Sequence, residues 1–252
     1  MFSKEVKKII AEKRGGVNES YLTLSSAGGM YTFTMLEPTD FFNLEDYAQA
    51  ALFKDVKDVW EVFAKLDDYL AEFFKNKQGQ NLIWGNVRPG AILVGDKIYI
   101  GPGAKIEPTA YIEGPVIIGP GTMVGPGAYI RGGTITGNNC VIGHGTEAVK
   151  TIMLDRAAAP HFNYVGHSIL GNDTNIGAGG VLANSRLDGA EIGGTGLKKF
   201  GAVLGDRVKI GCNAVTEPGT FLLPDTWVMP CASIRRGWYK PGQRRTDLEK
   251  IN

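Results

Sequence analysis

Aliphatic residues recur every six positions between residues 100 and 130. They are Ile100, Ile106, Ile112, Ile118, Val124 and Ile130, and four positions after the first five stand Ala104, Ala110, Val116, Thr122 and Ala128. Glycines fill many of the places between, where a residue free to adopt positive φ lets the chain turn sharply. Neither a helical period of 3.6 nor a strand period of 2 reproduces this pattern. A six-residue count predicts a mainly β chain folded as a parallel β-helix.

Composition limits what else the chain can be. Its 252 residues are 43% hydrophobic and 21% charged, enough to bury the core of one elongated domain with an accessory. The formal net charge of +1 implies no general attraction to nucleic acid or to a membrane surface. The sequence contains neither an apolar run of about 18 residues nor the pattern of a secretory signal. We therefore expect a cytoplasmic protein without nucleic-acid or membrane partners.

The cysteines and histidines do not have the spacing of a metal site. Cys140, Cys212 and Cys231 are odd in number and lack a CxxC pair, which favours reduced thiols. Three histidines could in principle supply the converging ligands that catalytic zinc needs, but their positions do not match that pattern. We expect no metal.

Residues 1–80 are predicted to form a mixed, mostly helical N-terminal cap. Lys4 to Arg14 has the pattern of a short amphipathic helix, and residues 21–35 that of a hairpin. Apolar residues at threes and fours between Leu44 and Phe74 predict two helices, broken near Lys54 to Asp58. We expect this cap to cover the open end of the first coil, and the alternative is that it carries a partner or substrate loop.

Residues 81–234 are predicted to be the β-helix, and residues 235–252 a basic C-terminal tail. Three six-residue turns make a coil of about 18 residues, so residues 100–234 would give about seven coils stacked at the strand spacing. The six-residue count is lost at residues 154–164 and again at 185–200. Breaks in a repeat are expected to be loops, where function concentrates.

The first break lies in a specific stretch of sequence, from Glu147 to Asn184. It contains Lys150, the motif His161-Phe-Asn-Tyr164-Val-Gly166, the motif Asn175-Ile-Gly-Ala-Gly179 and Asn184. With Arg131 and Glu147 in frame, it resembles the acetyltransferase domain of the bifunctional N-acetylglucosamine-1-phosphate uridyltransferase/glucosamine-1-phosphate N-acetyltransferase family. The resemblance implies a left-handed β-helix, a homotrimer with active sites between subunits, and acetyl-CoA as the donor. It also implies an amino-sugar phosphate as acceptor and a place in UDP-N-acetylglucosamine biosynthesis.

The chemistry of acetyl transfer fits these residues. An amino sugar is an ammonium ion near neutral pH and must lose a proton before it attacks a thioester, so a general base is needed. His161 is the predicted base, and backbone N–H groups in the turns would stabilise the oxyanion. The resemblance gives the remaining residues acceptor-binding roles: Arg131 and Lys150 on the phosphate, Tyr164, Asn175 and Asn184 on the sugar, and Glu147 near the amine.

Structural roles are the alternatives for several of these residues. An asparagine at a β-helix corner can be a turn or ladder residue, Tyr164 can belong to the core, and His161 can be structural. His144 and His167 are expected to lie on the surface rather than to take part in catalysis.

The second break departs from the family pattern. In the family a loop here carries a substrate-binding lysine, and this chain offers Lys198 or Lys199 without a register to choose between them. Ser185 stands where the family has an aromatic residue, and Val149 replaces one lysine of a pair. The acceptor therefore stays open between an amino-sugar phosphate and a related amino sugar or nucleotide sugar.

The donor is expected along the later coils. Cys212 and Pro230 fall where the family places small residues in contact with CoA. The basic run that begins with Arg235 and Arg236 could bind its phosphates, with Trp238 and Tyr239 stacking on the adenine. The alternative for this run is a solvated tail.

Three functions remain open from the sequence. The first is a CoA-dependent sugar N-acetyltransferase without uridylyl transfer, because residues 1–80 are too short for a nucleotide-binding domain and lack its glycine-rich start. The second is a sugar acyltransferase that takes its acyl group from an acyl carrier protein. The third is a non-catalytic protein that binds a sugar nucleotide or partners a separate nucleotidyltransferase.

Overall fold

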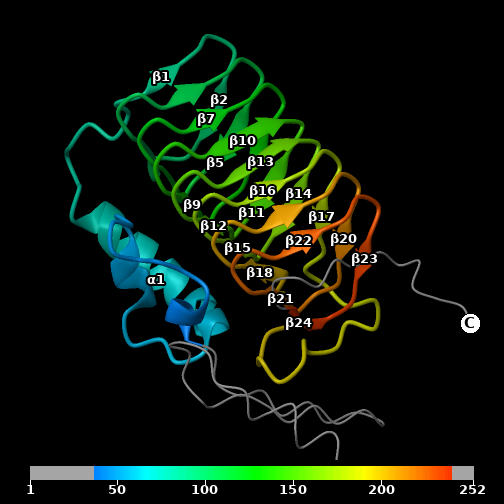
Figure 1. The fold of residues 1–252 in the computed structure, drawn as a ribbon. Helices are drawn as coiled ribbons and strands as arrows, with labels where there is room; N and C mark the ends of the chain where they lie inside the picture. Colours follow the sequence, from blue (N-terminus) through cyan, green and yellow to red (C-terminus); the bar gives the residue numbers. More distant parts are fainter. Residues whose placement is uncertain (1–36, 240–252) are drawn as a thin grey trace, which may run out of the picture. The chain divides into compact units, whose positions relative to one another are not determined.

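The computed structural model describes residues 37–239. Within them the chain winds as a parallel β-helix whose coils stack one on another (Figure 1). Each coil contributes one strand to each of three parallel sheets, called sheets A, B and C, and each sheet has eight strands. The chain passes from sheet B to sheet C to sheet A and then starts the next coil. The predicted mainly β, repeat-built fold is therefore confirmed.

The strands are two to four residues long. Sheet B contains β1 (Asn86–Val87), β4 (Lys105–Ile106), β7 (Met123–Val124), β10 (Val141–His144), β13 (Ala158–His161), β16 (Asn175–Ile176), β19 (Lys209–Ile210) and β22 (Trp227–Val228). Sheet C contains β2 (Ile92–Val94), β5 (Tyr111–Glu113), β8 (Tyr129–Ile130), β11 (Glu147–Val149), β14 (Tyr164–Gly166), β17 (Val181–Leu182), β20 (Val215–Thr216) and β23 (Ser233–Ile234). Sheet A contains β3 (Ile98–Ile100), β6 (Val116–Ile118), β9 (Thr134–Thr136), β12 (Ile152–Met153), β15 (Ile169–Leu170), β18 (Ala202–Leu204), β21 (Thr220–Leu222) and β24 (Gly237–Tyr239).

The six-residue pattern marks the interior of the coils. All six aliphatic residues from Ile100 to Ile130 are fully buried, and so are the five small residues that follow them. They belong to one continuous apolar cluster that runs from Ile98 to Tyr239. Each aliphatic stacks on its equivalent in the next coil, as Ile100 does on Ile118, so the repeat buries its own core.

The break expected at residues 154–164 is not a loop. Met123 pairs with Val141 eighteen residues later, whereas Val141 pairs with Ala158 only seventeen residues later. The chain forms β13 and β14 within this stretch and keeps its coils in register. A coil with one residue fewer breaks a count in sixes without interrupting the winding, so the expected loop is wrong here. The break at 185–200 is a genuine insertion, since Val181 pairs with Val215 thirty-four residues on.

The β-helix begins within its predicted range of residues 81–234 and ends beyond it. Strand β1 begins at Asn86, ahead of the clean six-residue count, and Ile83 forms a further bridge to Ile100. At the other end, β24 pairs with β21 beyond the predicted last residue, Ile234. Residues 237–239 are thus part of the β-helix and not of a tail.

A helical segment, residues 37–75, precedes the coils. It contains the 3-10 turns η2 (Pro38–Asp40), η3 (Ala50–Phe53) and η4 (Val59–Glu61) and the helix α1 (Val62–Lys75). The predicted break near Lys54 to Asp58 is present, but the first predicted helix is only the turn η3. The helix expected at 4–14 and the hairpin expected at 21–35 lie outside the described residues.

The outer face of sheet A is a continuous apolar row. Paired residues on successive strands form it: Tyr99, Ile117, Ile135, Ile152, Ile169, Val203, Phe221 and Trp238. From Ile117 to Phe221 these side chains are at most 1% exposed, although they are outside the interior cluster. Strands that are buried on both faces read as unbroken apolar runs, as in β6 and β18.

The helical segment covers this row from end to end. Phe73 of α1 meets Tyr99 on β3, with ring centroids 5.5 Å apart, and Trp60 meets Phe221 on β21 at 5.6 Å. Phe41 reaches Trp238 on β24 at 6.2 Å. Our expectation that the segment covers the open end of the first coil is therefore wrong, because the larger apolar surface is the side of sheet A.

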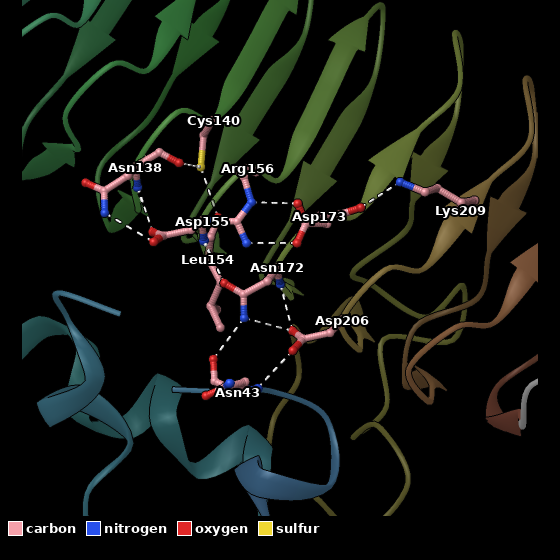
Figure 2. Close-up of polar contacts among 10 residues, drawn as sticks. All are labelled: Asn43, Asn138, Cys140, Leu154, Asp155, Arg156, Asn172, Asp173, Asp206 and Lys209. Carbon is pink, nitrogen blue, oxygen red and sulfur yellow. Dashed lines mark hydrogen bonds and ion pairs between the residues drawn. The ribbon is translucent and has the colours of Figure 1, made fainter. Parts of the chain in front are cut away.

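A polar ladder joins the coils at the corner between sheets A and B (Figure 2). The backbone N–H of Asn138 donates to Asp155 at 2.7 Å, that of Asp155 to Asn172 at 3.2 Å, and that of Asn172 to Asp206 at 2.7 Å. The N–H of Asn43, in the helical segment, donates to the other carboxylate oxygen of Asp206 at 2.9 Å. The ladder thus satisfies buried backbone groups of the corner and also ties the helical segment to the coils.

We predict that Ile152→Ala lowers the free energy of unfolding by about 2 to 4 kcal/mol, the usual cost of emptying a fully buried isoleucine site. The loss arises because Ile152 lies between sheet A and the helical segment, where the surroundings cannot collapse fully. Urea denaturation would measure it. The matched control is Ile92→Ala on sheet C, where the side chain is 48% exposed and we expect a change of about 0.5 kcal/mol. Equal losses in the two variants would contradict the burial of the outer face.

Candidate functional site

Apart from Asn175, which is in sheet B, the predicted site residues lie on sheet C and on the two corners beside it. The B–C corner stacks Pro126, His144, His161, Ala178 and Cys212 in successive coils, through backbone hydrogen bonds from each following residue to the corner residue one coil earlier. The C–A corner contains Lys150, His167 and the inserted loop 183–201, and Gly219 and Gly237 in the later coils. Sheet C lies between these corners and presents Glu147 beside Tyr164.

Arg131 and Glu147 form one ion pair of this region. Arg131 follows β8, Glu147 begins β11, and the guanidinium donates to the carboxylate at 3.0 Å. The guanidinium also lies 5.7 Å from the centre of the Tyr129 ring. The hydrogen bond to Glu147 raises the pKa of Arg131 above its usual value. The two predicted acceptor-binding residues are thus in contact with each other.

Lys150 lies at the C–A corner and is paired with α1. Its ammonium donates to both carboxylate oxygens of Asp67, at 3.2 and 2.9 Å. Its φ of 45° is in the left-handed region, which turns the chain at the corner. Because the pair is largely exposed, it contributes little to stability, and an anionic ligand could compete for the lysine.

His167 lies one coil above Lys150 and contacts Asn184. The side-chain amide nitrogen of Asn184 is 2.9 Å from Nδ1 of the imidazole, and the Phe63 ring of α1 lies 6.4 Å from the imidazole ring. Burial lowers the pKa of His167 to about 4, and the positive charges of Lys199, Lys150 and Arg131 act in the same direction. His167 is therefore neutral at physiological pH and half-buried, which differs from the surface role expected for it.

The inserted loop returns to this corner through Lys199. Ser185 and Lys199 form an antiparallel bridge, and the N–H of Phe200 donates to the carbonyl of Asn184 at 3.0 Å. Lys199 is the lysine whose charge acts on His167. Lys198 is also exposed, and the sequence alone did not distinguish the two.

His161 lies apart from this cluster, on the B–C corner. It ends β13, pairs with His144 of the preceding coil, and is exposed. Its backbone N–H donates to the side chain of Asn163 at 3.1 Å, which fixes the turn after it. Cys212 and Pro230, the predicted donor contacts, are exposed on the same corner in later coils.

Asn175 is on a different face from the other acceptor-binding candidates. It lies in sheet B between Ala158 and Lys209 and is half-buried. A single chain therefore brings together Arg131, Glu147, Lys150, Tyr164, Asn184 and Lys199, and leaves His161 on the B–C corner and Asn175 beyond it in sheet B.

The residues expected to hold the adenine are not available for stacking on it. Tyr239 is only 6% exposed in the interior cluster, and Trp238 stacks on Phe221 with centroids 3.8 Å apart. Both belong to β24, whose pairing with β21 draws them into the fold, so this expectation is wrong. Arg235 and Arg236 follow β23 at the C–A corner, on the opposite side of sheet C from Cys212 and Pro230.

Metal binding and membrane insertion find no structural support in residues 37–239. No group of three or more histidine, cysteine, aspartate or glutamate side chains in this range is placed to hold a metal ion. No helix in this range is long and apolar enough to cross a membrane. The three cysteines are free, with Cys140 buried and the other two exposed.

Sequence reasoning missed His167, Asp67 and Phe63. His167 and Asn184 are seventeen residues apart, the spacing that also joins His144 to His161, so the coil length could have revealed their contact. Nothing comparable indicates Asp67, because α1 has no repeat that fixes its position along the coils.

Comparison with known proteins finds partial matches to this β-helix. The model of the GMPPB C-terminal domain family matches residues 112–229, which run from β5 to β22. The match contains His161 and the C–A corner and leaves out the helical segment.

Curated relatives match about a third of the chain. The bifunctional sugar-1-phosphate nucleotidylyltransferase/acetyltransferase of Sulfurisphaera tokodaii is 35% identical over 98 residues, which are 36% of this chain and 24% of that protein. The bifunctional protein GlmU of Methanococcus vannielii is 40% identical over 83 residues, which are 30% of this chain and 20% of that protein. The chain thus spans about a quarter or less of the length of these relatives.

A solved structure, the acetyltransferase domain of PglB from Neisseria gonorrhoeae FA1090, is 14% identical over 69% of this chain and 63% of its own. Its TM-score is 0.19, which is too low to support a conclusion.

We predict that Lys199→Gln raises the pKa of His167 above its value of about 4, because a positive charge that opposes protonation is removed. The pKa should stay below the ordinary 6.5, since burial remains the larger cause. A pH titration followed by NMR of the imidazole would measure the shift. Lys198→Gln is the matched control and should leave the pKa unchanged. The same shift in both variants would contradict the placement of Lys199.

Proposed function

We propose that the chain is an N-acetyltransferase. The proposal is based on its hexapeptide-repeat, acyltransferase-like β-helix domain, which is related in part to GlmU. The protein transfers the acetyl group of acetyl-CoA to the amine of an amino-sugar phosphate such as glucosamine 1-phosphate. The observation that carries the proposal is the polar cluster on sheet C and the C–A corner, in which three cations lie around a tyrosine and an asparagine.

The cluster has the chemistry of an acceptor site. Arg131, Lys150 and Lys199 supply positive charge for a phosphate through charge-assisted hydrogen bonds. Tyr164 and Asn184 supply neutral groups that orient hydroxyls. Glu147 places a carboxylate where an ammonium group could rest before it loses its proton.

His161 acts as the general base. The amine nitrogen attacks the thioester carbonyl carbon, a C–N bond forms, and His161 takes the proton that the nitrogen loses. The C–S bond then breaks, and the departing thiolate receives the proton from the imidazolium. Exposed backbone N–H groups of the B–C corner are the candidates for stabilising the oxyanion.

A homotrimer would complete the site. His161, Cys212 and Pro230 lie on the B–C corner, and the acceptor cluster lies toward the C–A corner of the same chain. In a homotrimer the B–C corner of one subunit would lie against the acceptor cluster of the next. Acetyl-CoA would then lie along the B–C corner, in a groove between two subunits.

The test is acetylation by the purified protein. Acetyl-CoA and a panel of amino-sugar phosphates are incubated with the protein, and free thiol release is followed. We expect turnover with at least one amino-sugar phosphate of the panel. In His161→Ala we expect kcat to fall about 100-fold or more, the usual contribution of a general base. The control is Lys105→Ala, exposed on β4 and three strands from β13 in sheet B, which should keep wild-type activity.

Each other outcome identifies a different error. Turnover unaffected by His161→Ala would remove His161 as the base. Turnover only with an acyl carrier protein thioester would show that the donor is wrong. Binding of a sugar nucleotide without turnover would favour a binding protein, and a monomer in sedimentation would overturn the site between subunits.

A further inference from the structure

His167 has the positive φ of other corner residues such as Lys150, together with a hydrogen-bonded imidazole that lies near an aromatic ring. Its φ is 46°, in the left-handed region that few side chains adopt without strain. Its N–H donates to the carbonyl of Val149, and its own carbonyl accepts from Gly201. These two backbone hydrogen bonds fix His167 to the chain on either side of it, and the Phe63 ring lies near its imidazole.

The partner of the imidazole is the amide of Asn184. The Asn184 side chain is only 8% exposed, and its Nδ2 lies 2.9 Å from Nδ1 of His167. An amide nitrogen is only a donor, so Nδ1 is the acceptor and the ring proton is on Nε2. With Nδ2 turned toward the ring, Oδ1 is the end of the Asn184 amide that does not face the imidazole.

Tyr164 stands beside the same amide. A side chain at Gly166 would collide with the amide of Asn184 and with Cε1 of the Tyr164 ring, at 2.9 Å from the latter. Because Gly166 has no side chain, the Tyr164 ring and the Asn184 amide can both lie close to its backbone. Tyr164, Asn184 and His167 form a single packed group in two neighbouring coils.

Burial, and after it the charges around His167, lower the pKa of the imidazole and keep it neutral. Lys199 from the inserted loop, Lys150 from the corner and Arg131 from β8 all oppose its protonation, and Asp67 from α1 is the group that favours it. With a pKa of about 4, the imidazole can accept a hydrogen bond throughout the physiological range. A protonated ring could not, because both nitrogens would then be donors.

We propose that His167 is a positioning residue for acceptor binding, which holds the amide of Asn184 so that its oxygen faces the amino-sugar phosphate. The inference rests on the proposed function and adds a residue to it. It also makes α1 part of the acceptor site, since Phe63 seats the imidazole. The recognised group on the ligand is a hydroxyl or N–H donor next to the phosphate.

The kinetic test compares two substitutions of His167. His167→Ala removes Nδ1, which accepts the hydrogen bond from Asn184. We expect KM for the amino-sugar phosphate to rise about fivefold to tenfold, the worth of one hydrogen bond, and KM for acetyl-CoA to stay unchanged. His167→Asn should stay within about twofold of wild type, because its Oδ1 can replace Nδ1 and asparagine tolerates positive φ. Asn139→Ala is the control for backbone strain, since Asn139 has a φ of 54° and lies exposed at the A–B corner.

The state of the imidazole gives a measurement that does not depend on activity. Long-range ¹⁵N NMR of the wild-type protein should show His167 with its proton on Nε2 and Nδ1 unprotonated near pH 7. If the wild type binds an amino-sugar phosphate without acetylating it, the proposed function fails, and dissociation constants replace KM in the same comparison. Three results would overturn the inference. They are a proton on Nδ1, an unchanged KM or dissociation constant for the amino-sugar phosphate in His167→Ala, and an equal rise of that constant in Asn139→Ala.

Discussion

The apolar outer face of sheet A is the constraint on which the rest of the structure depends. A row that runs from Tyr99 to Trp238 cannot be left against water, and the coils have no further surface to cover it. The helical segment provides that cover, and its position is fixed by aromatic contacts at both ends. Since α1 must follow sheet A, it also passes the C–A corner, where it meets Lys150 and His167. Burial of a hydrophobic face thus brings a carboxylate and an aromatic ring to the candidate site.

The coils were predictable because their signal is local. A six-residue repeat that buries its own aliphatics reveals the interior from sequence alone, as the residues from Ile100 to Ile130 did. The signal fails where a coil has seventeen residues, and Val141 to Ala158 was therefore misread as the start of a loop. The unbroken apolar runs of β6 and β18 indicated that sheet A is covered on both faces, but they do not identify what covers it.

The candidate site was predictable only in part. Sequence placed Arg131, Glu147, Tyr164 and Asn184 in one region, and all four lie on sheet C or at its end. Contacts between distant segments had no such signal: Lys150 and Asp67 are 83 residues apart, and no pattern relates α1 to the coils. Trp238 and Tyr239 were misassigned for the opposite reason, because a basic, aromatic stretch at the chain's end resembles a ligand surface, whereas pairing with β21 buries it.

The polar ladder of Figure 2 and the aromatic contacts of Phe41 have a consequence for the order in which this chain folds. Asn43 donates a hydrogen bond to Asp206, 163 residues later in the sequence. Phe41 can contact Trp238 only after the last strand, β24, has formed. The helical segment leaves the ribosome before any coil, yet its docking surface is complete only when β24 has formed. During synthesis the helical segment can contact only those strands of sheet A that have already formed, so its docking stays incomplete until β24 pairs with β21. We expect this to be the period in which the chain depends most on chaperones and is most prone to self-association.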